Sequence, residues 1–251
     1  MPGFVALPLP KRSLPTGLCR AAACMGVPWV SMACVDYGLQ DPDAAELEPL
    51  QVEERFLQEP LPGLDVLFVV DSTGSMAAEQ EAFALGTPAF VEGLDALGVA
   101  WQVGVTSTDP VDAGALLGRP WILTSGGPNP AEALAAALRV GTDSPPPSAG
   151  LDAAAQVLAD VGGLNAGFRR DDAPLHIVFL SDGDDASGAW LGMNAQAAFL
   201  ALLDDEAART GRAAVASAVV GNVPDGCEGP AGTVSPGTRY AAVAEQSGGR
   251  S

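Results

Sequence analysis

The segment Leu64–Met76 reads LDVLFVVDSTGSM, and its pattern indicates the fold expected for the chain. Val66–Val70 is a short apolar run rich in β-branched and aromatic residues, which is typical of a strand covered on both faces of a sheet. The run stops at Asp71, and a hydroxyl-rich turn containing Gly74 precedes a helical pattern. The segment therefore predicts a buried strand that ends in a carboxylate, where open α/β sheets place their ligand sites.

Asp71, Thr73 and Ser75 stand at alternate positions of this turn. In a turn that curls over the end of a strand, alternate side chains can converge on one point. One carboxylate with two hydroxyls is a set of hard oxygen ligands, which suits Mg²⁺, Mn²⁺ or Ca²⁺ and suits zinc or copper poorly. The same residues also fit a plain polar turn in which Ser or Thr caps the next helix.

The pattern Asp71-x-Thr73-x-Ser75 resembles the metal-ion-dependent adhesion site of von Willebrand factor type A (VWA) domains, Asp-x-Ser-x-Ser, with Thr73 at the middle position. Two further elements follow in the order found in that family. One is Gly141-Thr142, in a loop before a helix; the other is HIVFLSD, an apolar strand that ends in Asp182. The resemblance implies that Thr142 and Asp182 complete the metal site.

Apolar runs and helical patterns alternate along the rest of the chain. Strands are predicted at Ala100–Thr106, Trp121–Thr124, Leu175–Ser181 and Ala213–Val220, and helices at Ala77–Leu97, Ala131–Leu138, Leu151–Leu158, Ala195–Ala208 and Tyr240–Gln246. This alternation predicts an α/β fold with a doubly wound, mainly parallel sheet flanked by helices. The VWA resemblance covers residues 64–251 and implies the same fold. A VWA domain normally continues after the position of Gly249, so the last strand and helix are expected to be missing and an apolar face of the sheet partly uncovered.

Several polar or helix-breaking residues carry local expectations. Gly86 and Pro88 interrupt the pattern of the first helix, so a kink or a break is expected there. Asp184 and Asp185 are expected to be solvated, while favouring a nearby cation through their negative potential. The only histidine, His176, lies within an apolar strand, which favours a packing role over a catalytic one.

The VWA resemblance implies a protein-binding module that depends on a divalent ion, Mg²⁺ (or Mn²⁺/Ca²⁺). In the family, hydroxyls and aspartates hold the ion directly or through water, and one open coordination position takes an acidic group of a partner protein. The chemistry agrees, because Mg²⁺ is held by one or two carboxylates and keeps exchangeable waters, one of which a partner carboxylate can replace. The partner expected here is therefore an unidentified protein that presents a carboxylate.

Two other functions fit parts of the sequence. The first is a scaffold with the VWA fold and a non-functional metal site, which Thr73 and the missing C-terminal elements favour. The second is a metal-dependent phosphohydrolase of the haloacid dehalogenase type, which also places Asp at the end of a buried strand. That chemistry needs Asp-x-Asp, and Thr73 stands where the second Asp would act as acid or base. We therefore expect a binding module and not an enzyme.

The composition limits the partners further. The chain of 251 residues is 48% hydrophobic, which indicates a packed globule. It has 31 acidic and 12 basic residues and a net charge of −19. Nucleic acid is an unsuitable partner, because binding of phosphates needs a basic patch.

The first 63 residues read as an export signal followed by a tether. Basic residues precede the uncharged segment Ala21–Ala33, which is too short to span a bilayer and suits a signal peptide over residues 1–33. Ala33 precedes Cys34, which resembles a bacterial lipoprotein cleavage site with Cys34 as the lipidated residue. Residues 34–63 are acidic and interrupted by prolines, as expected for an extended tether. These features predict an exported protein of the bacterial cell envelope, lipid-anchored, periplasmic or extracellular, whose contact with a membrane is through the lipid alone.

Overall fold

A computed structural model of the chain describes residues 63–160, 162–229 and 232–251. All of these residues belong to one compact unit. The predicted signal peptide, the lipidated Cys34 and the tether up to residue 62 lie outside the described residues and stay predictions. None of the helices within the described ranges is long and apolar enough to cross a membrane.

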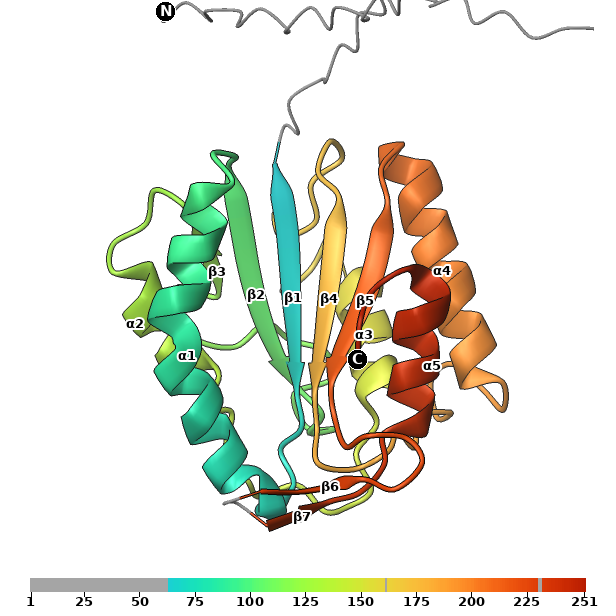
Figure 1. The fold of residues 1–251 in the computed structure, drawn as a ribbon. Helices are drawn as coiled ribbons and strands as arrows, with labels where there is room; N and C mark the ends of the chain where they lie inside the picture. Colours follow the sequence, from blue (N-terminus) through green and yellow to red (C-terminus); the bar gives the residue numbers. More distant parts are fainter. Residues whose placement is uncertain (1–62, 161, 230–231) are drawn as a thin grey trace, which may run out of the picture. The chain divides into compact units, whose positions relative to one another are not determined.

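A five-stranded sheet with the order β3-β2-β1-β4-β5 forms the centre of the fold (Figure 1). Its strands are β1 (Leu64–Val70), β2 (Trp101–Ser107), β3 (Ile122–Thr124), β4 (Leu175–Leu180) and β5 (Ala214–Val219). All neighbours pair in parallel except β3, which pairs antiparallel with β2. The predicted α/β class with a mainly parallel sheet is thus confirmed, and β1 is the central strand.

Helices pack on both faces of this sheet. They are α1 (Ala77–Ala96), which follows the short 3₁₀ turn η1 (Gly74–Met76), and α2 (Pro130–Ala137), α3 (Gly150–Ala159), α4 (Ala195–Thr210) and α5 (Thr238–Ser247). Alternate residues of β1 face opposite sides, as the pleat requires. Phe68 joins the core beneath α1 and α2, whereas Leu67 joins the core beneath α3, α4 and α5.

Pro88 does not end α1, so of the kink or break expected at Gly86 and Pro88 the break is wrong, and the kink stays a prediction. A proline lacks the N–H that would bond to the carbonyl four residues earlier, here that of Ala84. The hydroxyl of Thr87 donates to this carbonyl instead, at 2.9 Å. The local substitute donor explains how the helix continues from Ala77 to Ala96 with Pro88 inside it.

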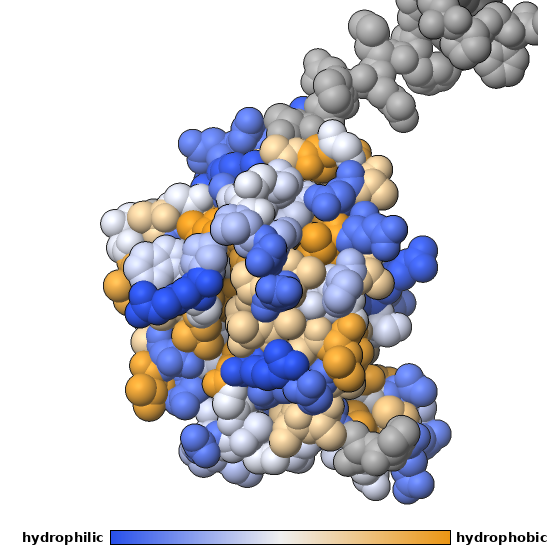
Figure 2. All heavy atoms as spheres, turned by 90° about the vertical axis from the view of Figure 1, so that its left-hand side faces the viewer, coloured by the Kyte–Doolittle hydropathy of each residue, from blue (hydrophilic) through white to orange (hydrophobic). Residues whose placement is uncertain are grey.

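One part of the sheet face beside α1 is open. A groove of about 300 Å³ lies between α1 and the β4–β5 side of the sheet, and Phe83, Phe90, Val178 and Val219 line it. The exposed fraction of Val219 is 51%. Around α1 and α2, hydrophilic and hydrophobic side chains are interspersed on the surface (Figure 2). Part of the apolar face over β4 and β5 is therefore uncovered, whereas the absence of a last strand and helix, from which this was expected, stays a prediction.

A small hairpin, absent from the sequence-based prediction, precedes α5. Its strands β6 (Cys227–Gly229) and β7 (Gly232–Val234) pair antiparallel. The hairpin lies at the edge of the sheet where the parallel strands end, beside the start of α1 (Figure 1). The backbone N–H of Ser235 donates to the carbonyl of Asp182 at 2.9 Å, which ties the hairpin to the end of β4.

His176 makes stability depend on pH. Its ring is half-buried in β4, its Nε2 lies 2.9 Å from the hydroxyl of Ser217, and burial lowers its pKa below 6.5. Because the folded protein favours the neutral ring, this contribution is present above pH 6.5 and is lost as the pH falls through the lowered pKa. We expect the stability advantage over His176→Gln to shrink below pH 6.5, measured by urea unfolding across pH. An advantage that is constant with pH would contradict this assignment.

Candidate metal site at the carboxyl edge of the sheet

Asp71 follows β1 and is fixed by both neighbouring segments. Its side chain lies inside the protein, with an exposed fraction of 2% for the residue. One carboxylate oxygen, Oδ1, accepts the backbone N–H of Thr73 at 2.8 Å, and Oδ2 accepts the hydroxyl of Ser181 at 2.6 Å. The carboxylate is thereby held between the turn that follows β1 and the end of β4.

The turn after Asp71 gathers its hydroxyls as the spacing predicts. Thr73 is buried, Ser75 is exposed, and their hydroxyl oxygens lie 3.4 Å apart. The 3₁₀ turn η1 produces this arrangement, because it curls the chain directly before α1 begins. Gln80, one turn into α1, donates to the carbonyl oxygens of Asp71 at 3.0 Å and Gly141 at 2.8 Å.

The loop that carries Thr142 lies against this turn. Thr73 and Ser144 form an isolated parallel bridge, and the N–H of Ser144 donates to the carbonyl of Ser72 at 3.1 Å. A Cβ on Gly74 would lie 3.8 Å from the carbonyl oxygen of Thr142, so the two segments are in close contact. Thr142 itself is half-buried. The structure thus places Thr142 beside the Asp71–Ser75 turn.

Asp182 stands at the end of the neighbouring strand. β4 pairs in parallel with β1, Val70 opposite Leu180, so Asp71 and Asp182 leave the sheet at the same edge. Asp182 is half-buried. The five residues singled out from the sequence are therefore collected by three segments that meet at one edge: the turn after β1, the loop before α3 and the end of β4.

Other hydroxyls at this edge were not predicted from the sequence. The hydroxyl of Ser72 lies 2.7 Å from that of Ser144 and 3.2 Å from that of Thr108, and Thr108 also accepts the N–H of Ser72 at 3.1 Å. These buried contacts join the segments that follow β1 and β2 to the loop before α3. The sequence does contain a signal, because a Ser or Thr stands within two residues after the end of each of β1, β2 and β4. The hydrogen-bond partners, however, are far apart in the chain.

The donor chemistry fits a hard divalent cation. The set contains two carboxylates and three hydroxyls, all oxygen ligands of the kind that Mg²⁺ and Ca²⁺ prefer. Each Asp71 oxygen accepts one hydrogen bond and keeps a lone pair. Within the described ranges, no group of three or more His, Cys, Asp or Glu side chains could hold a metal. A site here would therefore rely on its hydroxyls.

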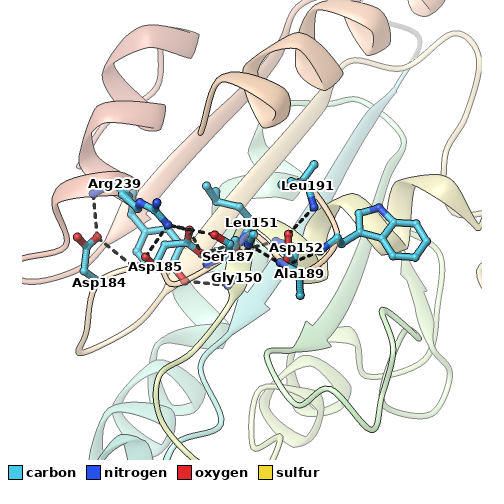
Figure 3. Close-up of polar contacts among 12 residues, drawn as sticks. Gly150, Leu151, Asp152, Asp184, Asp185, Ser187, Ala189, Leu191 and Arg239 are labelled. Carbon is cyan, nitrogen blue, oxygen red and sulfur yellow. Dashed lines mark hydrogen bonds and ion pairs between the residues drawn. The ribbon is translucent and has the colours of Figure 1, made fainter. Parts of the chain in front are cut away.

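A second polar network fixes the loop after Asp182 (Figure 3). Asp152, in the first turn of α3, has an exposed fraction of 3%. Its carboxylate accepts backbone N–H groups from four consecutive residues, Gly188, Ala189, Trp190 and Leu191, at 2.9–3.1 Å. The loop thus wraps around one buried carboxylate, which accepts four of its backbone N–H groups.

Asp185 belongs to this network and is not solvated, so that expectation was wrong. Its side chain is fully buried, and burial raises its pKa despite hydrogen bonds from Ser187 and Leu151 and the nearby charge of Arg239. Arg239, from α5, lies 3.4 Å from Oδ2 of Asp185 and donates to the Asp185 and Ser187 carbonyls. Asp184 is half-buried and accepts the backbone N–H of Arg239 at 2.8 Å.

No family model matches the sequence, and no curated protein matches it.

Proposed function

We propose that the chain is a VWA-like protein-binding module that captures a carboxylate of a partner protein through a divalent cation, Mg²⁺ or a similar ion. Asp71, Thr73, Ser75, Thr142 and Asp182 would hold the ion, directly or through water. The observation that carries the proposal is the meeting of these residues' three segments at one edge of the sheet. The ion would supply a positive centre with an exchangeable coordination position.

The protein's own groups prepare the site for this role. Ser181, Gln80 and the hydroxyls of Ser72, Thr108 and Ser144 hold the three segments together through direct hydrogen bonds. A site that is already assembled binds with less loss of conformational entropy than one that must be ordered by its ligand. The half-buried Asp182 and exposed Ser75 leave the outer side of the site accessible to a partner.

Removal of the Asp182 charge tests the proposal. Calorimetric titration of Mg²⁺ and Mn²⁺ into the full chain should show saturable binding, and Asp182→Asn should weaken it at least tenfold, because a hard cation loses an anionic ligand. Asp184→Asn is the matched control: it removes the same charge two residues along, and its metal affinity should stay within about threefold. Absence of saturable binding in the wild type would refute the proposed function. An equal loss in both variants would point to a general effect of charge.

A further inference from the structure

An apolar pocket of about 120 Å³ opens beside the candidate metal site. Ser181 and Asp182 form its side toward the site. The remaining wall is mainly apolar and comes from the start of α1, the end of β5 and the β6–β7 hairpin; its apolar members include Met76, Phe83, Val219 and Val234. The pocket therefore adjoins Asp182, one of the proposed metal ligands, and Ser181, which donates to Asp71.

The size and lining of the pocket suit one branched aliphatic side chain. An apolar cavity of about 150 Å³ can hold a benzene molecule, so 120 Å³ accommodates a side chain of the size of Val or Leu. Val219 is 51% exposed and would be covered by such a group, whereas Met76 is fully buried and gives the pocket a fixed wall. Burial of apolar surface supplies the free energy for this contact.

Glu79 adds a polar requirement to the same pocket. Its Oε2 atom is buried and has no hydrogen-bond partner. Among the described residues, it is the one buried side-chain oxygen or nitrogen atom in this situation. A buried acceptor without a partner is costly, and an incoming N–H would remove that cost. A peptide backbone that places an aliphatic side chain in the pocket carries such N–H groups.

The hairpin side of the pocket is formed before any ligand arrives. Besides the bond from Ser235 to Asp182, Gly237 N–H donates to the carbonyl of Gly221 at 3.0 Å. Gly226 packs so closely that a Cβ there would lie 2.2 Å from the carbonyl oxygen of Val234. A pocket fixed in this way can select a ligand by shape.

We propose that this pocket is a specificity subsite, which selects a partner segment with a branched aliphatic side chain next to its metal-bound carboxylate. The inference rests on the proposed function, since the carboxylate is taken to bind at the metal. It narrows the partner from any acidic protein to one that presents an acidic residue flanked by aliphatic residues.

Three labelled pentapeptides test the subsite with the full chain in millimolar Mg²⁺: Gly-Leu-Asp-Leu-Gly, Gly-Ser-Asp-Ser-Gly and Gly-Leu-Asn-Leu-Gly. We expect the first to bind about tenfold more tightly than the second, since burial of one Leu side chain favours it by this much or more. The third should lose the Mg²⁺-dependent part of binding. Alkylation of Cys227, a free and exposed thiol that lines the pocket, should be slowed by the first peptide when followed by mass spectrometry.

Val219→Asn and a matched control complete the experiment. Val219→Asn should bring the affinities of the first two peptides within about twofold of each other, because the pocket wall becomes polar. Val215→Asn makes the same change on the same face of β5, outside the pocket, and should keep the preference. Equal Mg²⁺-dependent binding of both Asp peptides to the wild type would overturn the subsite and leave the proposed function standing. No Mg²⁺-dependent binding of either would overturn both.

Discussion

Asp152→Ala is expected to lower the free energy of unfolding by about 4 kcal/mol, the largest stability change we predict for a single site. Four backbone N–H groups converge on this carboxylate, and a hydrogen bond to a charged group makes a net contribution of about 1.5–3 kcal/mol. The total is expected to be smaller than four separate contributions, because one side chain accepts all four bonds and such contributions are not additive. The carboxylate also lies in the first turn of α3, where the helix dipole favours a negative charge. Urea unfolding of the full chain measures the loss.

Asp160→Ala is the matched control, because it makes the same substitution at the other end of α3. The Asp160 side chain accepts one backbone N–H, that of Leu164, at 2.9 Å in an exposed position. Asp160→Ala should therefore lower the free energy of unfolding by about 1 kcal/mol or less. If both variants unfold at the same urea concentration, the Gly188–Leu191 loop does not depend on Asp152.

Asp71→Asn is expected to reduce the affinity for Mg²⁺ and Mn²⁺ at least hundredfold. The substitution keeps the size of the side chain and one carbonyl oxygen, which can still accept the N–H of Thr73, but it replaces the oxygen that accepts the hydroxyl of Ser181. The stability of the metal-free protein should therefore fall by about 1–3 kcal/mol. It removes the negative charge on which binding of a hard cation depends. Calorimetric titration gives the affinity directly.

Thermal unfolding provides a second readout for Asp71→Asn. A cation at 100 times its dissociation constant stabilises the folded state by about 2.7 kcal/mol, so saturating Mg²⁺ should raise the Tm of the wild type and leave that of the variant unchanged. Asp112→Asn is the control, because it removes the same charge from another carboxylate that accepts a serine hydroxyl, that of Ser107 at the end of the neighbouring β2. Asp112 is not one of the proposed metal ligands. A hundredfold loss in Asp112→Asn as well would rule out Asp71 as a specific ligand.

Buried strands were the most predictable part of the fold. The runs in β1 and β4 lie in the interior of the sheet, where nearly every residue is apolar, so these two strands are visible in the sequence alone. The β6–β7 hairpin was missed because its strands are short and poor in strand-forming residues, as in Cys227–Gly229 (CEG), whereas the equally short β3 reads ILT. The continuation of α1 past Pro88 was not visible in the sequence, because the donor that replaces the missing N–H is the side chain of Thr87.

The candidate site likewise has a part that the sequence predicts and a part that it does not. Asp71, Thr73 and Ser75 are close in the chain, so their spacing predicts how the turn gathers them. The contact between Ser72 and Ser144 spans 72 residues and depends on how the sheet assembles, which no local pattern reveals. The burial of Asp185 could not be predicted from the local sequence either. It depends on α5, whose Arg239 contacts Asp185 although the two residues are 54 positions apart in the chain.

The strand order has a consequence for how the chain folds. β1 is synthesised before the other strands of the sheet and occupies its central position. Asp71, directly after β1, accepts a hydrogen bond from Ser181, which lies 110 residues later in the chain. Contacts between such distant segments form slowly, because a long loop must close before they give any stability. During synthesis the apolar strand Leu64–Val70 can therefore pair with β2 well before β4 has been made. Until β4 pairs with it, one edge of β1 is unpaired, and an unpaired strand edge favours aggregation.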